Sequence, residues 1–384
     1  MKARILLMAG LGCGLLSGVV AEPMDSYLSK PRGFVCPPCY HVDNLFQTEI
    51  YDHDGQCPIC GMSLIEEPRS FNADKLEIHT GSGNFIFQHG LSHPDKPIIV
   101  FYHKPAGFGP DSPILLIVPG AGRNAWDYRD AWIQASEDHG VLVLAPSFDE
   151  HQYDFASYHL GGIVSNLELR NVEREDEGAA PSVYRLKDED LVFTVNNNRD
   201  EWIFGDFDAI FRRVVAVTGS RQQTYDIFGH SAGGQILHRL AIFKPDSLAG
   251  RIVAANSGFY TIPSHEVALP FGVGGTEISS NDLVKAFSEN LVLLLGEADN
   301  LSETRGIMLH TPTVDRRGRG RLSRGKYFYR ESRRQAESLG ATFNWRIEVI
   351  RDVGHDYRLM GQAAAEYLYA AGDRHSPGLP DSER

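Results

Sequence analysis

Cysteine is scarce in this 384-residue chain and is confined to one end: there are five cysteines, and the last is Cys60. The long remainder therefore has no disulfide to support its fold. Positively charged residues are also fewer than negatively charged ones: there are 37 Lys and Arg and 50 Asp and Glu, which gives a net charge of −13. This balance disfavours a general nucleic-acid-binding protein. Beyond the first residues no apolar run is long enough to cross a bilayer, so no stable membrane anchor is expected.

The N-terminal residues are the one strongly apolar stretch. A short positive start leads into an apolar run at 5–20, and Ala21 ends a small-residue exit. This pattern predicts a secretory signal peptide at 1–21 and an exported protein, either periplasmic or secreted. An uncleaved anchor is the alternative, but a run of about 16 residues is shorter than the ~20 that span a bilayer. A lipoprotein signal at Cys13 is disfavoured by Gly10, where a large aliphatic residue is usual.

The rest of the composition is that of a globular protein, and the length suits one large domain with an appendage. A polar linker at 22–32 precedes a cysteine-containing segment at 33–67. Strand and helix patterns then alternate over 71–372, and the polar tail at 373–384 is expected to be disordered. The stretch 148–205 has low hydrophobicity and breaks the alternation, which predicts a cap-like insertion over the edge or top of the sheet.

Short apolar runs predict the strands of the large region. They lie at 84–89, 97–103, 114–120, 141–147, 224–230, 251–258, 291–297 and 345–352. The middle runs are apolar on both faces, as in a buried parallel sheet, and the first two are expected to form an antiparallel lead-in. Because helical patterns separate the later runs, we predict an α/β fold with a doubly wound, mostly parallel sheet.

The most informative motif is Gly-His-Ser-Ala-Gly at 229–233, between an apolar strand and an amphipathic helix. A nucleophilic serine in this position needs a sharp, strained turn, and small neighbours avoid a clash there. The turn would place the Ser231 hydroxyl at the carboxyl end of the sheet, beside a helix N-terminus. The context predicts Ser231 as a catalytic nucleophile, with a chance serine in a Gly-rich turn as the alternative.

A serine nucleophile needs a base, and the base needs a carboxylate that orients it. The chain order expected for such a fold is serine, acid, histidine. Asp299 follows the apolar run at 291–297 and is the predicted acid, with Glu297 as the second choice. His355 follows the last predicted strand and is the predicted base. The alternatives are a solvated loop carboxylate and a surface loop histidine.

Two backbone N–H groups should bind the oxyanion that forms during acyl transfer. We assign one to Ala232, directly after the nucleophile, and the other to Ala121 in the Gly-rich loop after the third strand. Three aromatic residues follow strands at the same end of the sheet and are candidates for substrate binding, although ordinary loop packing is an equally good explanation. They are Tyr158, Phe259 and Tyr260.

Several segments of the large region resemble one known family. They are VPGAGRNAWDYRDAW, LAPSFDE, YDIFGHSAGGQILHR, FKPD, ANSGFYTIP, LLGEADN and VGHDY. Together they look like the secreted bacterial α/β-hydrolases, closest to the branch described as similar to polyhydroxybutyrate depolymerases and feruloyl esterases. The resemblance covers most of 71–372 and implies an α/β-hydrolase fold with Ser231, Asp299 and His355 as its triad. The substrate stays open, because this fold hosts many chemistries.

A basic segment at 316–334 holds nine Lys and Arg residues and falls between the predicted acid and base. One interpretation is that it attracts an anionic substrate or polymer. The other is that it is a solvated loop whose charge balances nearby acidic residues. The sequence does not decide between them.

Two Cys-x-x-Cys pairs, at Cys36/Cys39 and Cys57/Cys60, have seventeen residues between them. This spacing is typical of a zinc ribbon, in which four thiolates close a tetrahedral structural site. CPICGM and the preceding HDGQ also resemble the second knuckle of heavy-metal-binding modules from metal-efflux proteins. A disulfide-closed module, or a metal-carrying, metal-sensing or redox role, stays open. Four thiolates leave no open position for a catalytic metal, so we expect structural zinc and no cofactor for catalysis.

The sequence thus predicts an exported serine hydrolase that cleaves carboxylic esters, small or polymeric, through an acyl-enzyme. A peptidase or amidase with the same triad is one alternative. Another is a non-catalytic metal-binding or interaction protein built on a hydrolase-like scaffold. The expected partners are an ester substrate and, for the zinc-ribbon-like module, a further protein.

Overall fold

The structure is a computed structural model, and it describes most of the chain. The described residues are 34–35, 50–56, 58, 64–66, 76–87, 92–93, 96–150, 152–175, 182–303 and 305–370. The predicted signal peptide, linker and C-terminal tail lie outside them, as do all five cysteines.

A small antiparallel sheet forms within the predicted zinc-ribbon-like segment. Its strands are β1 (Phe34–Val35), β2 (Ile50–Tyr51) and β3 (Ile65–Glu66), in the order β2-β1-β3. Val35 pairs with both Ile50 and Ile65, so β1 is the central strand. The Leu64 N–H donates to the Gly55 carbonyl at 2.7 Å and ties the third strand to the loop after β2.

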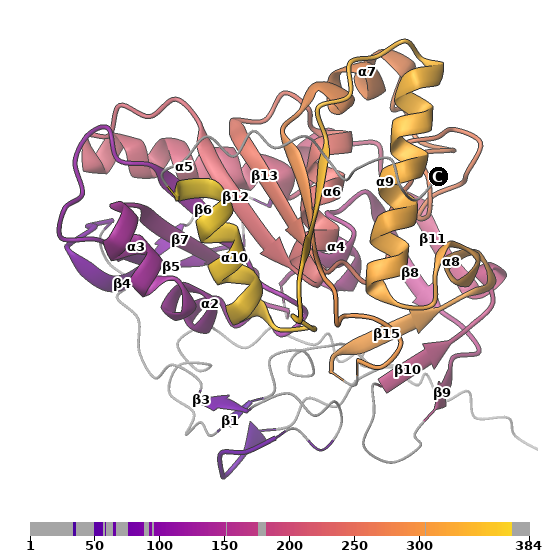
Figure 1. Ribbon diagram of the computed structural model, residues 1–384, viewed down its shortest axis with the longest axis horizontal. Coiled ribbons are helices and arrows are strands. Elements are labelled where there is room, and N and C mark those ends of the chain that lie inside the picture. The colour runs from indigo at the N-terminus through magenta and orange to yellow at the C-terminus, as the bar shows by residue number, and fades with distance from the viewer. Residues whose placement is uncertain are drawn as a thin grey trace, which may run out of the picture. The chain divides into compact units, whose positions relative to one another are not determined.

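An eight-stranded sheet is the framework of the large region (Figure 1). Its order is β16-β14-β13-β12-β6-β7-β5-β4. The bounds, in chain order, are β4 (Gly81–Phe87), β5 (Ile98–Lys104), β6 (Ile114–Val118), β7 (Leu142–Ser147), β12 (Tyr225–His230), β13 (Ala249–Ala255), β14 (Leu291–Gly296) and β16 (Arg346–Ile350).

Six strands of this sheet are mutually parallel: β16, β14, β13, β12, β6 and β7. Strand β5 runs antiparallel to both of its neighbours, β4 and β7. Every residue of β6, β12 and β14 is buried, because helices cover both faces of the sheet. The prediction of a doubly wound, mostly parallel sheet with an antiparallel lead-in is therefore confirmed.

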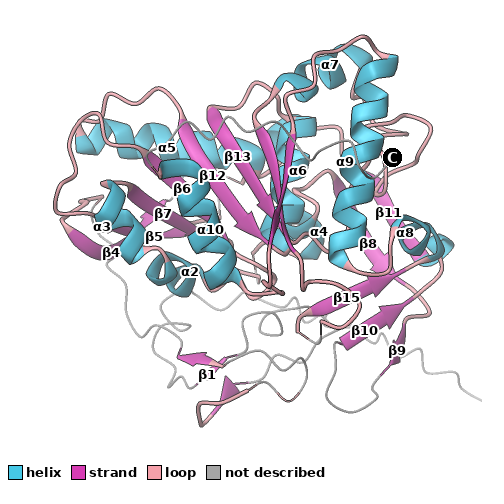
Figure 2. Ribbon diagram, in the orientation of Figure 1, coloured by secondary structure: helices cyan, strands magenta, loops and turns pink. Residues whose placement is uncertain are grey.

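Two groups of helices cover the sheet (Figure 2). The first group is α2 (Ala125–Ala131), α3 (Ile133–His139) and α10 (Tyr357–Tyr369), which pack against one another. The second includes α5 (Phe204–Thr218), α6 (Ala232–Phe243), α7 (Ser280–Ser288) and α9 (Arg321–Ser338), in which α7 contacts both α6 and α9. Figure 1 shows α10 in front of the strands and α5 behind them, so each face is covered.

Residues 148–205 lie outside the eight-stranded sheet, and they hold short elements of their own. These are α4 (Phe155–His159), β8 (Val164–Leu169), β9 (Glu173–Glu175), β10 (Ser182–Arg185), η1 (Asp188–Asp190), β11 (Leu191–Val195) and η2 (Arg199–Glu201). Strand β8 pairs with β11, and β10 pairs with both β9 and β15 (Ile307–His310). The short helix α8 (Pro312–Arg317) then leads into α9. Segments far apart in sequence thus build one wall beside the carboxyl ends of the main strands.

Candidate active site

Ser231 stands at the turn from β12 into α6, in the strained conformation that the motif predicts. Its φ is 58° and its ψ is −114°, a region that non-glycine residues rarely adopt. The turn requires close backbone approach on both sides. A Cβ on Gly229 would lie 2.6 Å from the Gly233 carbonyl oxygen, and a Cβ on Gly233 would lie 2.0 Å from the Val118 oxygen. The glycines therefore let the helix begin directly against β6.

Ser231, His355 and Asp299 form a continuous hydrogen-bonded chain. The His355 Nε2 atom lies 3.1 Å from the Ser231 hydroxyl, and its Nδ1 atom lies 2.8 Å from Asp299 Oδ2. Three different strand ends supply these residues, as the sequence predicted. The second-choice acid, Glu297, is engaged elsewhere, because its Oε2 accepts the Asp352 backbone N–H at 3.1 Å.

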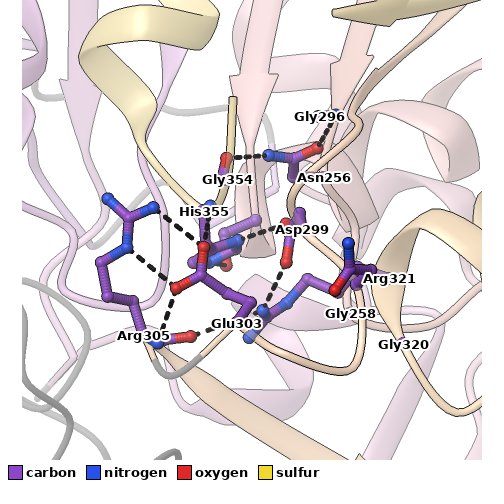
Figure 3. A network of polar contacts seen from close by, with 12 residues as sticks. Asn256, Gly258, Gly296, Asp299, Glu303, Arg305, Gly320, Arg321, Gly354 and His355 are labelled. Atoms are coloured by element: carbon purple, nitrogen blue, oxygen red, sulfur yellow. Dashed lines mark hydrogen bonds and ion pairs between the residues drawn. The ribbon is translucent and has the colours of Figure 1, made fainter. Parts of the chain in front are cut away.

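A buried arginine holds the free oxygen of Asp299. Arg321 Nη1 donates to Asp299 Oδ1 at 2.9 Å, and both side chains are at most 3% exposed (Figure 3). Burial alone would raise the pKa of Asp299, but the Arg321 charge and the His355 hydrogen bond lower it far below its usual range. Asp299 is therefore ionised wherever the protein is folded near neutral pH, and it can orient the imidazole.

The surroundings of His355 favour its neutral form. Its pKa is lowered from the ordinary value of 6.5 because burial and the Arg321 charge disfavour the imidazolium, and Asp299 offsets these effects only in part. A neutral imidazole that faces a serine hydroxyl with Nε2 and a carboxylate with Nδ1 has the arrangement of a general base.

Glu303 and Arg305 fix the backbone of His355, and sequence reasoning missed both. The His355 N–H donates to Glu303 Oε2 at 2.6 Å, while the Arg305 guanidinium grips both carboxylate oxygens at 2.8 and 2.9 Å (Figure 3). Burial raises the pKa of Glu303, but these hydrogen bonds outweigh it and lower the pKa to about 2. No local pattern marks these residues, because their role depends on a loop meeting the end of another strand.

Asn256 is a further residue that the sequence did not single out. Its Nδ2 donates to the Gly354 carbonyl at 3.1 Å, and its Oδ1 accepts the Gly296 N–H at 2.8 Å (Figure 3). It is 1% exposed and lies directly after β13. One amide thus ties together the strand ends that precede Asp299 and His355.

The two predicted oxyanion donors lie in the same pocket as Ser231. Ala121 and Ala232 both line the pocket that opens at the serine. Tyr158 contacts the loop that carries Ala121, because its hydroxyl donates to the Pro119 carbonyl at 2.8 Å. One loop residue and the first residue of α6 therefore line the pocket together with the nucleophile, and an oxyanion hole needs backbone N–H groups at such positions.

The pocket at Ser231 encloses about 890 Å³, open solvent at its mouth included. Its walls come from α4, α6, the insertion strands and β15. Apolar side chains dominate the lining: Phe155, Leu160, Leu167, Leu169, Leu191, Phe259, Pro270, Phe271, Ile307 and Leu309. No Asp, Glu, Lys or Arg lines this pocket within the described part of the chain. Such a cavity suits an uncharged acyl group.

The structure separates the three aromatic candidates for substrate binding. Phe259 lines the pocket beside Ser231. Tyr158 is fully buried and supports the Pro119 carbonyl instead of lining this pocket. Tyr260 stacks on Phe328 at 4.7 Å and lines a separate, smaller cavity of about 220 Å³. Position after a strand placed all three near the site, but it could not tell which way each ring points.

The basic segment at 316–334 forms the end of α8 and most of α9, and two of its arginines are buried. Arg321 is 3% exposed and pairs with Asp299 as described. Arg324 is 2% exposed and donates to the Gly258 carbonyl at 2.6 Å while it pairs with Asp315 at 3.3 Å. Neither interpretation from the sequence applies to these two residues. Arg321 and Arg324 are buried, so they form contacts inside the site and do not attract a polymer or lie in a solvated loop.

Two solved structures relate this arrangement to known proteins. Poly(aspartic acid) hydrolase-1 from Sphingomonas sp. KT-1 is 32% identical to this chain, with a TM-score of 0.63, over 75% of this chain and 98% of its own. The chain belongs to the α/β-hydrolase family. A second α/β-hydrolase, a poly(3-hydroxybutyrate) depolymerase from Bordetella parapertussis, is 26% identical with a TM-score of 0.64, over 79% and 93% of the two chains. The family predicted from the sequence motifs is thus confirmed. No curated protein matches the chain.

The N-terminal part of this α/β-hydrolase matches a different family. Residues 34–67 match the heavy metal binding domain. Cys36, Cys39, Cys57 and Cys60 lie outside the described residues, so their ligand role stays a prediction. Within the described ranges no group of three His, Cys, Asp or Glu side chains is placed to hold a metal ion. The same ranges contain no helix that is long and apolar enough to cross a membrane.

Proposed function

We propose that this α/β-hydrolase is a serine ester hydrolase that works through an acyl-enzyme. The observation that carries the proposal is the hydrogen-bonded chain from the Ser231 hydroxyl through His355 to Asp299, at the mouth of an apolar pocket. A lone serine is a weak nucleophile, and this chain supplies the base and the orienting carboxylate that it needs.

In the proposed reaction Ser231 Oγ attacks the ester carbonyl while His355 Nε2 takes the hydroxyl proton. The Ala232 and Ala121 N–H groups stabilise the negative charge on the carbonyl oxygen. His355 then gives its proton to the departing alcohol as the carbon–oxygen bond breaks, which leaves an acyl group on Ser231. A water molecule, deprotonated by His355, attacks this ester in turn and releases the acid and the free serine. Asp299 stabilises the imidazolium of His355 during both acylation and deacylation.

The substrate we propose is a carboxylic ester, either small or part of a polymer. The uncharged pocket lining supports an acyl group without charge, and the Bordetella relative is named for a polyester. Amide hydrolysis is the second candidate, because the Sphingomonas relative is named for poly(aspartic acid), whose units are joined by amide bonds.

Hydrolysis of p-nitrophenyl butyrate by the purified protein tests the proposal. We expect turnover in the wild type and a loss of at least about a thousandfold in kcat/KM for Ser231→Ala. Ser338→Ala is the matched control, because the exposed Ser338 hydroxyl donates to the Gln335 carbonyl of its own helix at 2.8 Å. Turnover that survives Ser231→Ala would exclude the proposed nucleophile. Equal turnover of the matching anilide would favour the amidase.

We further propose that the protein is exported after cleavage at Ala21 and that the four N-terminal cysteines hold a structural zinc ion. The donor set supports this, since four thiolates in two Cys-x-x-Cys pairs suit tetrahedral zinc, as does the match to a heavy metal binding domain. Elemental analysis should find one zinc per chain, with no disulfide by intact mass. Two disulfides and no metal would contradict the zinc assignment.

A further inference from the structure

Two small sheets that lie outside the eight-stranded sheet supply one wall of the Ser231 pocket (Figure 1). Strands β8 and β11 form the first, and β9, β10 and β15 form the second. We call the side chains that these sheets place in the pocket the strand wall: Leu167, Leu169, Tyr184, Leu191, Ile307 and Leu309. All six are aliphatic or aromatic, although the segments that supply them are far apart in the sequence.

The register of the first sheet gathers three leucines on one face. Along β8 the half-buried Leu167 and Leu169 alternate with the exposed Asn166 and Glu168. Leu169 lies directly opposite Leu191 of β11. Because alternate residues of a strand and direct cross-strand partners share a face, the leucines form one apolar surface toward the pocket.

The second sheet presents a similar face. Along β15 the half-buried Ile307 and Leu309 line the pocket, and they alternate with the buried Met308 and His310. Leu309 lies opposite Tyr184 of β10. Both small sheets thus direct their apolar positions to the same pocket.

The aliphatic members of the strand wall are only half-buried, even though they gather at one concave site. Scattered exposed leucines are ordinary, but apolar side chains that converge on a pocket and stay accessible to water indicate a binding surface. Covering them with a hydrocarbon group is favourable in proportion to the apolar area removed from water.

The position of the proposed base indicates which part of an ester faces this wall. In the proposed reaction His355 Nε2 gives its proton to the departing alcohol, so the alcohol must lie against that atom. Ser231, Ala121 and Ala232 line the pocket, whereas His355 and Asp299 are not among its lining residues in the described part of the chain. The acyl chain is therefore the part of the ester that suits this pocket.

The size of the pocket sets the length of that chain. The pocket encloses about 890 Å³, open solvent at its mouth included. An acetyl group has the bulk of about two water molecules, roughly 60 Å³, and would leave the strand wall uncovered. A chain of about six to ten carbon atoms carries enough methylene groups to cover aliphatic side chains from both sheets.

We infer that the strand wall is an acyl-chain subsite, and that the preferred substrates are esters of medium-chain aliphatic acids. This inference rests on the proposed ester hydrolysis and narrows its substrate class. It also gives the insertion at 148–205 a role, since Leu167, Leu169, Tyr184 and Leu191 belong to it.

The p-nitrophenyl esters of acetic, butyric, hexanoic and octanoic acid, used below their micelle concentrations, test the inference in the wild-type protein. A methylene that moves fully into apolar surroundings contributes about fourfold to binding. We expect kcat/KM to rise about twofold to fourfold for each methylene added between butyrate and octanoate, and so by at least about tenfold in total. An octanoate no better than the butyrate would overturn the inference.

A second series keeps the butyryl group and lengthens the alcohol, from ethyl through butyl to hexyl butyrate. Because the inference places the acyl chain against the strand wall, kcat/KM should change by less than about threefold across this series. A rise with alcohol length that matches the rise with acyl length would contradict the assignment of the wall to the acyl chain.

Leu169→Asn replaces an aliphatic member of the strand wall by a polar side chain of similar size. It should lower the ratio of octanoate to butyrate kcat/KM several-fold. Leu339→Asn is the matched control, because Leu339 is 37% exposed and does not line the pocket, and it should keep the wild-type ratio. A folded Leu169→Asn protein with the wild-type ratio would contradict the subsite, and the wild-type series decides the matter if this variant does not fold.

Failure of the proposed function gives a different result. In that case no ester is hydrolysed, or hydrolysis is unaffected by Ser231→Ala. Failure of the acyl-chain subsite alone leaves Ser231-dependent hydrolysis that does not increase with acyl length.

Discussion

The Arg321 guanidinium lies 2.9 Å from Asp299 Oδ1, on the side of the carboxylate that does not face His355. Both side chains are buried, so the ion pair is shielded from water and salt. Arg321 also donates to the Ile307 carbonyl at 3.0 Å, which joins the acid to the strand that forms the pocket wall. The charge state of the proposed triad and the shape of the pocket therefore depend on one residue.

Removal of this charge should change the pH dependence of hydrolysis. Arg321 is one of the groups that lower the pKa of His355, after burial. In Arg321→Met that pKa should rise, so the imidazole would be protonated at higher pH. We expect the acid limb of the kcat/KM profile to move upward, with the largest loss of activity below neutrality. Breaking a buried ion pair should also cost about 3 kcal/mol or more of stability.

Arg334→Met provides the control for this profile. Arg334 lies on the same helix, its side chain is 72% exposed, and it pairs with the neighbouring Glu331 at 3.3 Å. Its acid limb should coincide with that of the wild type. Arg321→Lys keeps the charge and should restore part of the shift. An unchanged acid limb in a folded Arg321→Met protein would show that Arg321 does not act on His355.

Glu303 should stabilise the fold in a pH-dependent way. Although burial raises its pKa, hydrogen bonds from Arg305 and the His355 N–H lower it to about 2. The folded state thus favours the ionised form, and the stabilisation is fully present above the unfolded pKa of 4.5 and is lost as pH falls toward 2. Denaturant titration should find Glu303→Gln less stable than the wild type at pH 7 and closer to it at pH 3. A constant difference between the two proteins would contradict this linkage.

Gly233 should not tolerate a side chain. A Cβ there would lie 2.0 Å from the Val118 carbonyl oxygen and 2.8 Å from the Pro119 oxygen, so β6 and α6 would have to separate. We expect Gly233→Ala to lose more than about 3 kcal/mol of stability and nearly all activity. Gly107→Ala, where a Cβ meets no atom within 4 Å, is the matched control. Thermal unfolding curves for the two variants give the comparison, and a Gly233→Ala protein with wild-type stability would refute the packing argument.

Glu289 is a residue whose neutralisation should stabilise the protein. Burial and the charge of Asp246 raise its pKa to about 7. The ionised form is therefore disfavoured in the fold, and stability is lost as pH rises from about 4.5 through 7. Glu289→Gln should unfold at higher denaturant concentration than the wild type at pH 8 and at nearly the same concentration at pH 4. Lower stability of the variant at pH 8 would show that Glu289 makes a favourable contact.

Local signals made much of the fold and the proposed triad predictable. Ser231 lies in a motif whose glycines, strand and helix are all within a few residues of it, so the strained turn could be inferred directly. Asp299 and His355 each follow a buried apolar run, and parallel strands bring their carboxyl ends to one edge. The sheet was predictable for the same reason, because its central strands are continuous apolar runs.

The support around the triad was not predictable, since it depends on contacts between distant segments. Arg321 is one of nine basic residues in its segment, and the packing of α9 against β14 distinguishes it and the buried Arg324 from the exposed arginines around them. Glu303 reaches His355 across 52 residues of chain. The same holds for the three aromatic residues predicted to bind substrate, because the direction of each ring depends on its packing. Phe259 lines the pocket, whereas Tyr158 and Tyr260 do not.

Covalent labelling with a fluorophosphonate tests directly whether Ser231 is an activated nucleophile. The reagent reacts with a serine that an adjacent base has activated. We expect one label per protein molecule, located by peptide mass spectrometry on Ser231, and no label on Ser231→Ala or on wild-type protein that has been denatured beforehand. A native protein that hydrolyses esters but takes up no label, or one labelled equally well after Ser231→Ala, would contradict it.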